Sequence, residues 1–165
     1  ISIEDAIGQL LIRREWTLAT AESCTGGGIG NRITSISGSS AYYLGGIIAY
    51  HNTVKQICLG VSPQILESYG AVSHKTAELM AHGVRKFGGA SVGLSVTGIA
   101  GPTGGTEEKP VGTVYIGVAS DIGTKVRHFV FPGNRQNVRT ESENAAFTLL
   151  HEHLIQEPPC GEDPQ

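Results

Sequence analysis

The hydrophobic period of the chain changes near Ala90, and this change constrains the fold more than any other feature. Before it, several stretches carry apolar side chains at helical spacing, as over residues 2–14. Over residues 90–96 every second residue is apolar, which is typical of a strand. A chain that holds both periods must cover a sheet with helices, so the sequence predicts an α/β protein.

The order of the predicted elements indicates a mixed sheet with helices on both faces. Helices are expected over residues 2–14, from 25 or 26 onward, over 52–59, from a cap at Ser62, from a cap at Ser73, and over 134–155. Strands are expected over residues 16–21, 42–50, 90–96, 111–119 and 125–131, with a hairpin at 121–123. We expect one domain over 1–156 and, from its prolines and acids, a disordered tail over 157–165.

Composition argues against several classes of protein. A chain of 165 residues can bury a proper core in one domain. The net charge is −3 and no basic tract occurs, so we expect no nucleic-acid partner. No apolar stretch reaches membrane-spanning length, so we expect no membrane partner. Three cysteines cannot all pair and lack zinc-site spacing, which indicates reduced thiols in a cytoplasmic protein.

The segment 20–28 places a serine between a predicted strand and a predicted helix. Ser23 follows a short apolar run and precedes a run of glycines. A helix N-terminus carries unpaired N–H groups that favour negative charge. Negative charge develops on a carbonyl oxygen when a serine attacks it, so Ser23 is a candidate nucleophile and the N–H groups of 24–27 are candidate donors to that oxygen. The alternative is that Ser23 or Thr25 only caps the helix.

Two residues after the next predicted strand are candidates for activating that serine. Tyr50 ends the strand and Lys55 lies one turn into the following helix, so both can face the carboxyl edge of the sheet, where α/β sites gather. A lysine accepts a proton only when it is neutral, and burial lowers its pKa toward that state. Tyr50 would relay the proton or hold the lysine. His51 is an alternative base, and a surface lysine beside a strand-end tyrosine is the alternative without chemistry.

A long loop and two arginines supply candidate contacts for a ligand. Loops as long as residues 98–110 are often functional, and small residues with free N–H groups suit a phosphate or a sugar. An ordinary solvated loop is equally expected. Arg135 and Arg139 lie four residues apart at the start of the last helix, where they either pair with a substrate phosphate or face solvent.

Some tempting motifs do not fit their context. Residues 89–93 match G-x-S-x-G, but Ser91 opens a strand and no strand-to-helix turn surrounds it, so we interpret the match as chance. His151 and His153 are two residues apart on a helix and do not form a metal pair. No Walker loop and no G-x-G-x-x-G motif occurs. We therefore expect no metal and no cofactor.

Several segments together resemble one family. They are Thr20–Gly27, Gly38–Ser40, Gly45-Gly46, Tyr50 with Asn52 and Lys55, Leu59–Val61, Gly70–Ser73, Thr97–Pro102 and Glu108–Val114. Spread over residues 4–154, they are similar to the C-terminal domain of the competence/damage-inducible protein CinA. That domain also occurs alone as nicotinamide-nucleotide amidase.

The resemblance implies a three-layer α/β/α domain that forms a homodimer or a higher homo-oligomer. It implies deamidation of nicotinamide mononucleotide to nicotinate mononucleotide and ammonia, by a serine nucleophile without a metal. By motif position the catalytic residues are Ser23, Lys55 and Tyr50. The residues expected to bind the substrate are Cys24, Thr25, Gly26, Gly27, Thr97, Gly98, Ile99, Ala100, Gly101 and Arg135.

Two positions depart from the family pattern, and two other functions stay open. His51 stands where a serine is common, which bears on the environment of Lys55, and Gly28 extends the glycine pair. The alternative function is a catalytically silent domain that binds a nucleotide or regulates. A nucleic-acid accessory role, suggested by the competence name, is disfavoured by the acidic balance of charge.

Overall fold

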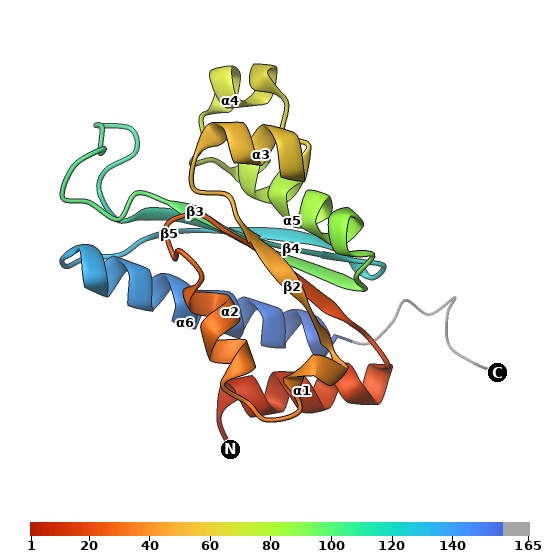
Figure 1. Ribbon diagram of the computed structural model, residues 1–165. Helices are drawn as coiled ribbons and strands as arrows, with labels where there is room; N and C mark the ends of the chain where they lie inside the picture. The colour runs from red at the N-terminus through yellow and green to blue at the C-terminus, as the bar shows by residue number, and fades with distance from the viewer. Residues whose placement is uncertain (157–165) are drawn as a thin grey trace.

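A mixed sheet of five strands forms the middle layer of the molecule, in the order β2-β1-β3-β4-β5 (Figure 1). The computed structural model describes residues 1–156, so the predicted tail lies outside the described residues. The strands are β1 (Leu18–Glu22), β2 (Tyr43–Ile48), β3 (Val92–Gly98), β4 (Thr113–Ser120) and β5 (Gly123–Val130). β1 pairs in parallel with β2 and β3, whereas β3, β4 and β5 pair antiparallel.

Helices cover both faces of this sheet (Figure 1). One face carries α1 (Ile3–Arg14), α2 (Gly28–Thr34) and α6 (Arg135–Leu154). The other carries α3 (Asn52–Leu59), α4 (Pro63–Tyr69) and α5 (His74–Gly88), and a short 3₁₀ turn, η1 (Ser39–Ala41), precedes β2. The expected α/β fold with a mixed sheet and two helical layers is confirmed. Among the described helices, none is both long and apolar enough to cross a membrane.

Local capping explains why most predicted boundaries lie within two residues of the observed ones. The Ser62 and Ser73 hydroxyls accept hydrogen bonds from the N–H groups of the third residue of α4 and α5. The helix expected from Thr25 or Gly26 begins two or three residues later, at Gly28 (α2). Gly26 and Gly27 have φ values of +58° and +101°, and a left-handed backbone cannot continue into a right-handed helix. The expected start of this helix was therefore wrong.

Two hydrophobic cores hold the layers together. The larger lies between the sheet and α1, α2 and α6; among its fully buried members are Leu11, Leu18, Leu94, Ile116, Phe147 and Leu150. The smaller lies between the sheet and the α3–α5 layer; its members include Ala19, Ala21, Leu59, Val61, Met80 and Val84. The alternation of Leu18 and Ala19 between these cores follows from the period-two geometry of β1.

Small residues on the sheet let α5 approach β3 closely. The Ser95 hydroxyl of β3 donates a hydrogen bond of 2.6 Å to the Ala77 carbonyl of α5. A Cβ atom added to Gly93 would collide with the Ala81 carbonyl of the same helix. Because the obstacle is backbone, the helix itself would have to move.

Gly93→Ala is expected to lower the free energy of unfolding by about 1–3 kcal/mol, since overpacking a tight contact carries such a penalty. Chemical denaturation of both proteins measures the change. Gly88→Ala, at the end of α5, is the matched control, because its Cβ would meet only side-chain atoms, the Ala19 methyl at 3.3 Å and Leu44 Cδ1 at 3.9 Å. An unfolding midpoint for Gly93→Ala equal to that of the wild type would contradict the close helix packing.

The topology brings three strand ends together at one edge of the sheet. The chain passes from β1 through α2 to β2, and then through α3, α4 and α5 to β3 on the other side of β1. The carboxyl ends of these parallel strands therefore share one edge, and the order reverses at β1. Ser23 follows β1 directly, Tyr50 follows β2, and Gly98 ends β3.

Candidate active site

A cavity of ≈ 250 Å³ opens at this edge of the sheet. Residues from the ends of all three parallel strands, from α3, from the α4–α5 turn and from α6 surround it. The lining consists of Ser23, Cys24, Tyr50, Asn52, Lys55, Ala71, Val72, Thr97, Gly98, Ala100 and Arg135. The three residues expected to be catalytic thus face one space, although 32 positions separate Ser23 from Lys55.

Lys55 lies beside the candidate nucleophile. Its Nζ donates a hydrogen bond of 3.2 Å to Ser23 Oγ and one of 2.7 Å to the Ala49 carbonyl. Only 1% of Lys55 is exposed. The residue sits in the first turns of α3, where the His51 ring begins the helix by accepting the Thr53 N–H at 3.1 Å. The geometry is that of a serine hydroxyl in direct contact with a lysine amine.

Burial also favours the neutral form of this lysine. Removal from water disfavours the ammonium and lowers the pKa of Lys55 from its ordinary value of 10.5. The charge of a Cys24 thiolate opposes this effect, but burial raises the pKa of the Cys24 thiol to about 11. At neutral pH the thiol is therefore protonated, which leaves it a poor nucleophile and leaves Lys55 easier to deprotonate.

Two of the four N–H groups of residues 24–27 already donate hydrogen bonds within the protein. The Gly26 N–H donates to the Ser23 carbonyl at 3.1 Å, and the Gly27 N–H donates to the Glu22 carboxylate at 3.2 Å. Within residues 23–27 of the structure, only the Cys24 and Thr25 N–H groups lack a carbonyl or carboxylate acceptor. The expectation that the whole run 24–27 would hold an oxyanion is therefore narrowed to these two donors.

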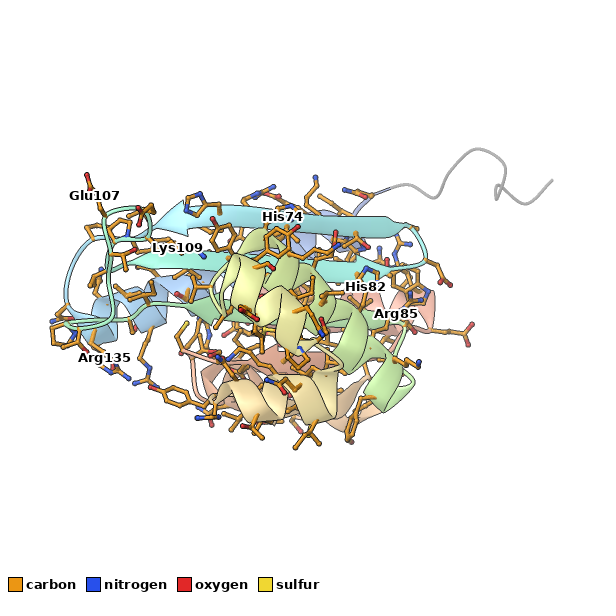
Figure 2. All side chains as sticks on the ribbon, turned by 90° about the horizontal axis from the view of Figure 1, so that it is seen from above. His74, His82, Arg85, Glu107, Lys109 and Arg135 are labelled. Carbon is orange, nitrogen blue, oxygen red and sulfur yellow. The ribbon has the colours of Figure 1, made fainter. Side chains whose placement is uncertain are left out.

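Tyr50 and Arg135 interact with each other at the mouth of the cavity. Tyr50 is 60% exposed, and its hydroxyl accepts a 3.0 Å hydrogen bond from Arg135 Nη2. Arg135 Nη1 donates to the Gly101 carbonyl at 2.8 Å, so the guanidinium also holds the long loop. Figure 2 shows Arg135 at the same end of the molecule as Glu107 and Lys109 of that loop. The Tyr50 hydroxyl contacts Arg135 and not the serine–lysine pair, and its role as a proton relay stays a prediction.

Arg139 does not line the cavity. Its Nε donates to the Cys24 carbonyl at 3.0 Å and its Nη2 donates to the Thr25 carbonyl at 3.4 Å. The side chain therefore supports the loop that carries Ser23 from the α6 side. Of the two arginines expected to meet a phosphate or solvent, Arg135 alone has the position for a ligand.

Five residues expected to bind the substrate do not line the cavity: Thr25, Gly26, Gly27, Ile99 and Gly101. Thr25 is fully buried and donates to Glu22, and the two glycines supply the left-handed turn. Gly101 contributes its carbonyl to Arg135.

Three lining residues were not expected from chemistry. Ala71 and Val72 lie in the Gly70–Ser73 segment that resembles the family, but they carry no reactive group and were not assigned to the site. Their turn is held in place because the Thr97 hydroxyl donates to the Ala71 carbonyl at 2.8 Å. Asn52 could have been found from the sequence, because it is a polar residue between the candidates Tyr50 and Lys55.

The motifs set aside in the sequence lie apart from this site. Ser91 Oγ accepts the Thr17 N–H at 2.9 Å, where β1 and β3 begin, at the opposite end of the sheet. It joins two strands and does not resemble a nucleophile elbow. Within residues 1–156, no group of three His, Cys, Asp or Glu side chains is placed to hold a metal ion.

Comparison with known proteins decides the family. The model of the CinA C-terminal domain matches residues 1–154. The chain belongs to the CinA family. A CinA-like protein of Desulfotalea psychrophila is 47% identical over 156 residues, which cover 94% of this chain and 38% of that protein. A putative competence-damage inducible protein of Halothermothrix orenii is 53% identical over 154 residues, which cover 93% of this chain and 37% of that protein. The chain thus spans little more than a third of these CinA relatives.

Solved structures of the CinA family share this fold. The competence damage-inducible protein A (ComA) from Klebsiella pneumoniae superimposes with a TM-score of 0.90 at 30% identity, covering 93% of this chain and 96% of that one. The competence/damage inducible protein CihA from Agrobacterium tumefaciens superimposes with a TM-score of 0.83 at 36% identity, covering 94% of this chain and 98% of that one. The three-layer architecture is therefore that of the CinA C-terminal domain.

Proposed function

We propose that this CinA-family chain is a serine amidohydrolase that deamidates nicotinamide mononucleotide to nicotinate mononucleotide and ammonia. The observation that carries the proposal is the 3.2 Å contact between Lys55 Nζ and Ser23 Oγ inside the cavity. A buried lysine with a lowered pKa, in contact with a serine hydroxyl, is an arrangement suited to nucleophilic catalysis. The choice of substrate comes from the family resemblance.

In the proposed reaction, neutral Lys55 takes the Ser23 proton as Ser23 Oγ bonds to the carboxamide carbon. The Cys24 and Thr25 N–H groups stabilise the oxygen that becomes negative. The protonated Lys55 then gives its proton to the departing ammonia, and an acyl-enzyme remains. Water, deprotonated by Lys55, attacks the acyl carbon, and the serine oxygen leaves with the proton. The net change is amide plus water to carboxylic acid plus ammonia.

An ammonia-release assay with the mononucleotide tests the proposal, with the product identified by mass and with chelator present or absent. Release of ammonia together with nicotinate mononucleotide, unaffected by chelator, is the expected result. Binding of the mononucleotide without release would support a silent nucleotide-binding domain instead. A salt-dependent shift of DNA at micromolar protein would favour the nucleic-acid role.

Arg135→Met is expected to raise KM for the mononucleotide by about 10–100-fold, because a charge-assisted contact contributes about 1.5–3 kcal/mol. We assign Arg135 to the substrate phosphate, since its guanidinium lines the cavity mouth. The nucleoside without phosphate should bind the variant and the wild type alike, which steady-state kinetics on both compounds can measure. Arg13→Met, an exposed change on α1, is the control. Equal KM changes for the two compounds would refute the assignment.

A further inference from the structure

Glu22 is a buried carboxylate beside the candidate nucleophile. It is the last residue of β1, directly precedes Ser23, and is only 3% exposed. Among the described residues, no lysine, arginine or histidine forms an ion pair with it. Burying a polar group is unfavourable unless it is hydrogen-bonded, so the donors to the Glu22 side chain show which parts of the chain it joins.

Four donors converge on this carboxylate, and all come from the chain that follows Ser23. Oε1 accepts from the Thr25 hydroxyl at 2.6 Å, from the Gly27 N–H at 3.2 Å and from the Ile29 N–H at 2.9 Å. Oε2 accepts from the Gly30 N–H at 3.0 Å. One side chain therefore links the strand before the serine to both the loop and the helix after it.

The contacts of Glu22 determine which N–H groups near Ser23 have no hydrogen-bond acceptor among the described residues. The first N–H groups of α2 have no carbonyl partner within the helix itself. Glu22 accepts the Ile29 and Gly30 N–H groups, and the Gly28 N–H donates to the Thr25 carbonyl. The N–H groups left without an acceptor are those of Cys24 and Thr25, the two residues that follow Ser23. On the other side, Arg139 holds the Cys24 carbonyl. Because a trans peptide points its C=O and N–H in opposite directions, the Thr25 N–H faces away from Arg139.

We propose that Glu22 is a positioning residue, whose carboxylate holds residues 23–27 in the geometry that presents Ser23 Oγ and the two open N–H groups to the substrate. This inference rests on the proposed amidase function. Glu22 lines no part of the cavity that contains Ser23, so it acts through the loop and does not touch the substrate.

Glu22→Gln tests the proposal, because the amide keeps the shape but turns an NH₂ group toward N–H donors. We expect kcat for ammonia release to fall on the order of 10²-fold, the effect of a small misplacement of reacting groups. KM should stay within about threefold, since substrate contacts are intact. The amide proton resonances of Gly27, Ile29 and Gly30 should shift upfield when the carboxylate acceptor is lost.

Two further variants make the result interpretable. Glu67→Gln, an exposed change on α4, should leave kcat and KM unchanged. If Glu22→Gln does not fold, Thr25→Val removes a single hydrogen bond from a fully buried residue and keeps the side-chain shape. It should lower kcat about 10-fold at nearly constant KM. A folded Glu22→Gln or Thr25→Val protein with wild-type kcat would overturn the positioning role.

A substrate-independent measurement separates this inference from the amidase proposal. A sulfonyl fluoride labels an activated serine by forming an O–S bond with loss of fluoride, and peptide mass mapping follows the modification of Ser23. We expect slower labelling in Glu22→Gln than in the wild type, by about 10-fold or more. Slower labelling in a protein that releases no ammonia would reject the amidase but support Glu22. Equal labelling rates would reject Glu22, and a wild-type Ser23 that neither labels nor turns over would reject both.

Discussion

Replacing Ser23 with alanine is expected to lower kcat for ammonia release on the order of 10⁴-fold or more, as loss of the nucleophile does in other serine enzymes. The Oγ that Lys55 contacts is the atom that would bond to the carboxamide carbon. Binding should persist, because the Arg135 side chain and the rest of the lining remain. Kinetics of ammonia release and calorimetric binding of the mononucleotide measure the two effects separately.

Ser91→Ala is the matched control for this change. Ser91 Oγ also accepts a hydrogen bond, in its case from the Thr17 N–H, and lies at the other end of the sheet, so its loss should affect stability and not turnover. Ammonia release at a near-normal rate from Ser23→Ala would exclude a serine mechanism.

Lys55→Met is expected to lower kcat by a similar factor, because Ser23 would lose the base that contacts it. In the wild type, kcat should rise with pH as Lys55 loses its proton. The inflection should lie below 10.5, since burial lowers the pKa of this lysine. A pH–rate profile of both proteins measures this, and the variant should lack the inflection. A mild effect of Lys55→Met would point to His51 as the base.

The same substitution also has a predictable effect on stability. Because the pKa of Lys55 is lower in the folded chain, the unfolded chain binds more protons between that lowered value and 10.5. Wild-type stability should therefore rise with pH through this window, and the full penalty of the buried ammonium applies below it. Relative to Lys55→Met, the wild type should be least stable below the window. Lys75→Met, on the surface of α5, keeps Lys55, so its stability should rise with pH in the same window as that of the wild type.

Local signals in the sequence were enough to predict most of the fold. The Ser62 and Ser73 caps depend on neighbouring residues alone, so the starts of α4 and α5 could be predicted from the sequence. The start of α2 could not, because it depends on backbone angles at Gly26 and Gly27 that the glycines permit but do not require.

The candidate site was predictable only in part. Parallel strands bring their carboxyl ends together, so the meeting of Ser23 and Lys55 at one edge follows from the order of elements. The bond from Arg139 to the Cys24 carbonyl joins residues 115 positions apart and depends on where α6 docks. The hydrogen bond from Arg135 to Tyr50 joins residues 85 positions apart and depends on the conformations of both side chains. No spacing in the sequence encodes these contacts.

Because Lys55 is almost fully buried, the proposed reaction depends on the apolar packing around α3. Leu59 and Val61, in the smaller core, have no reactive atoms, yet such residues keep water away from this side of the molecule. A change there that admitted solvent would let the amine recover its hydration shell and keep its proton at neutral pH. Damage to packing would thus appear first as a displaced pH optimum, in a protein whose shape was still intact.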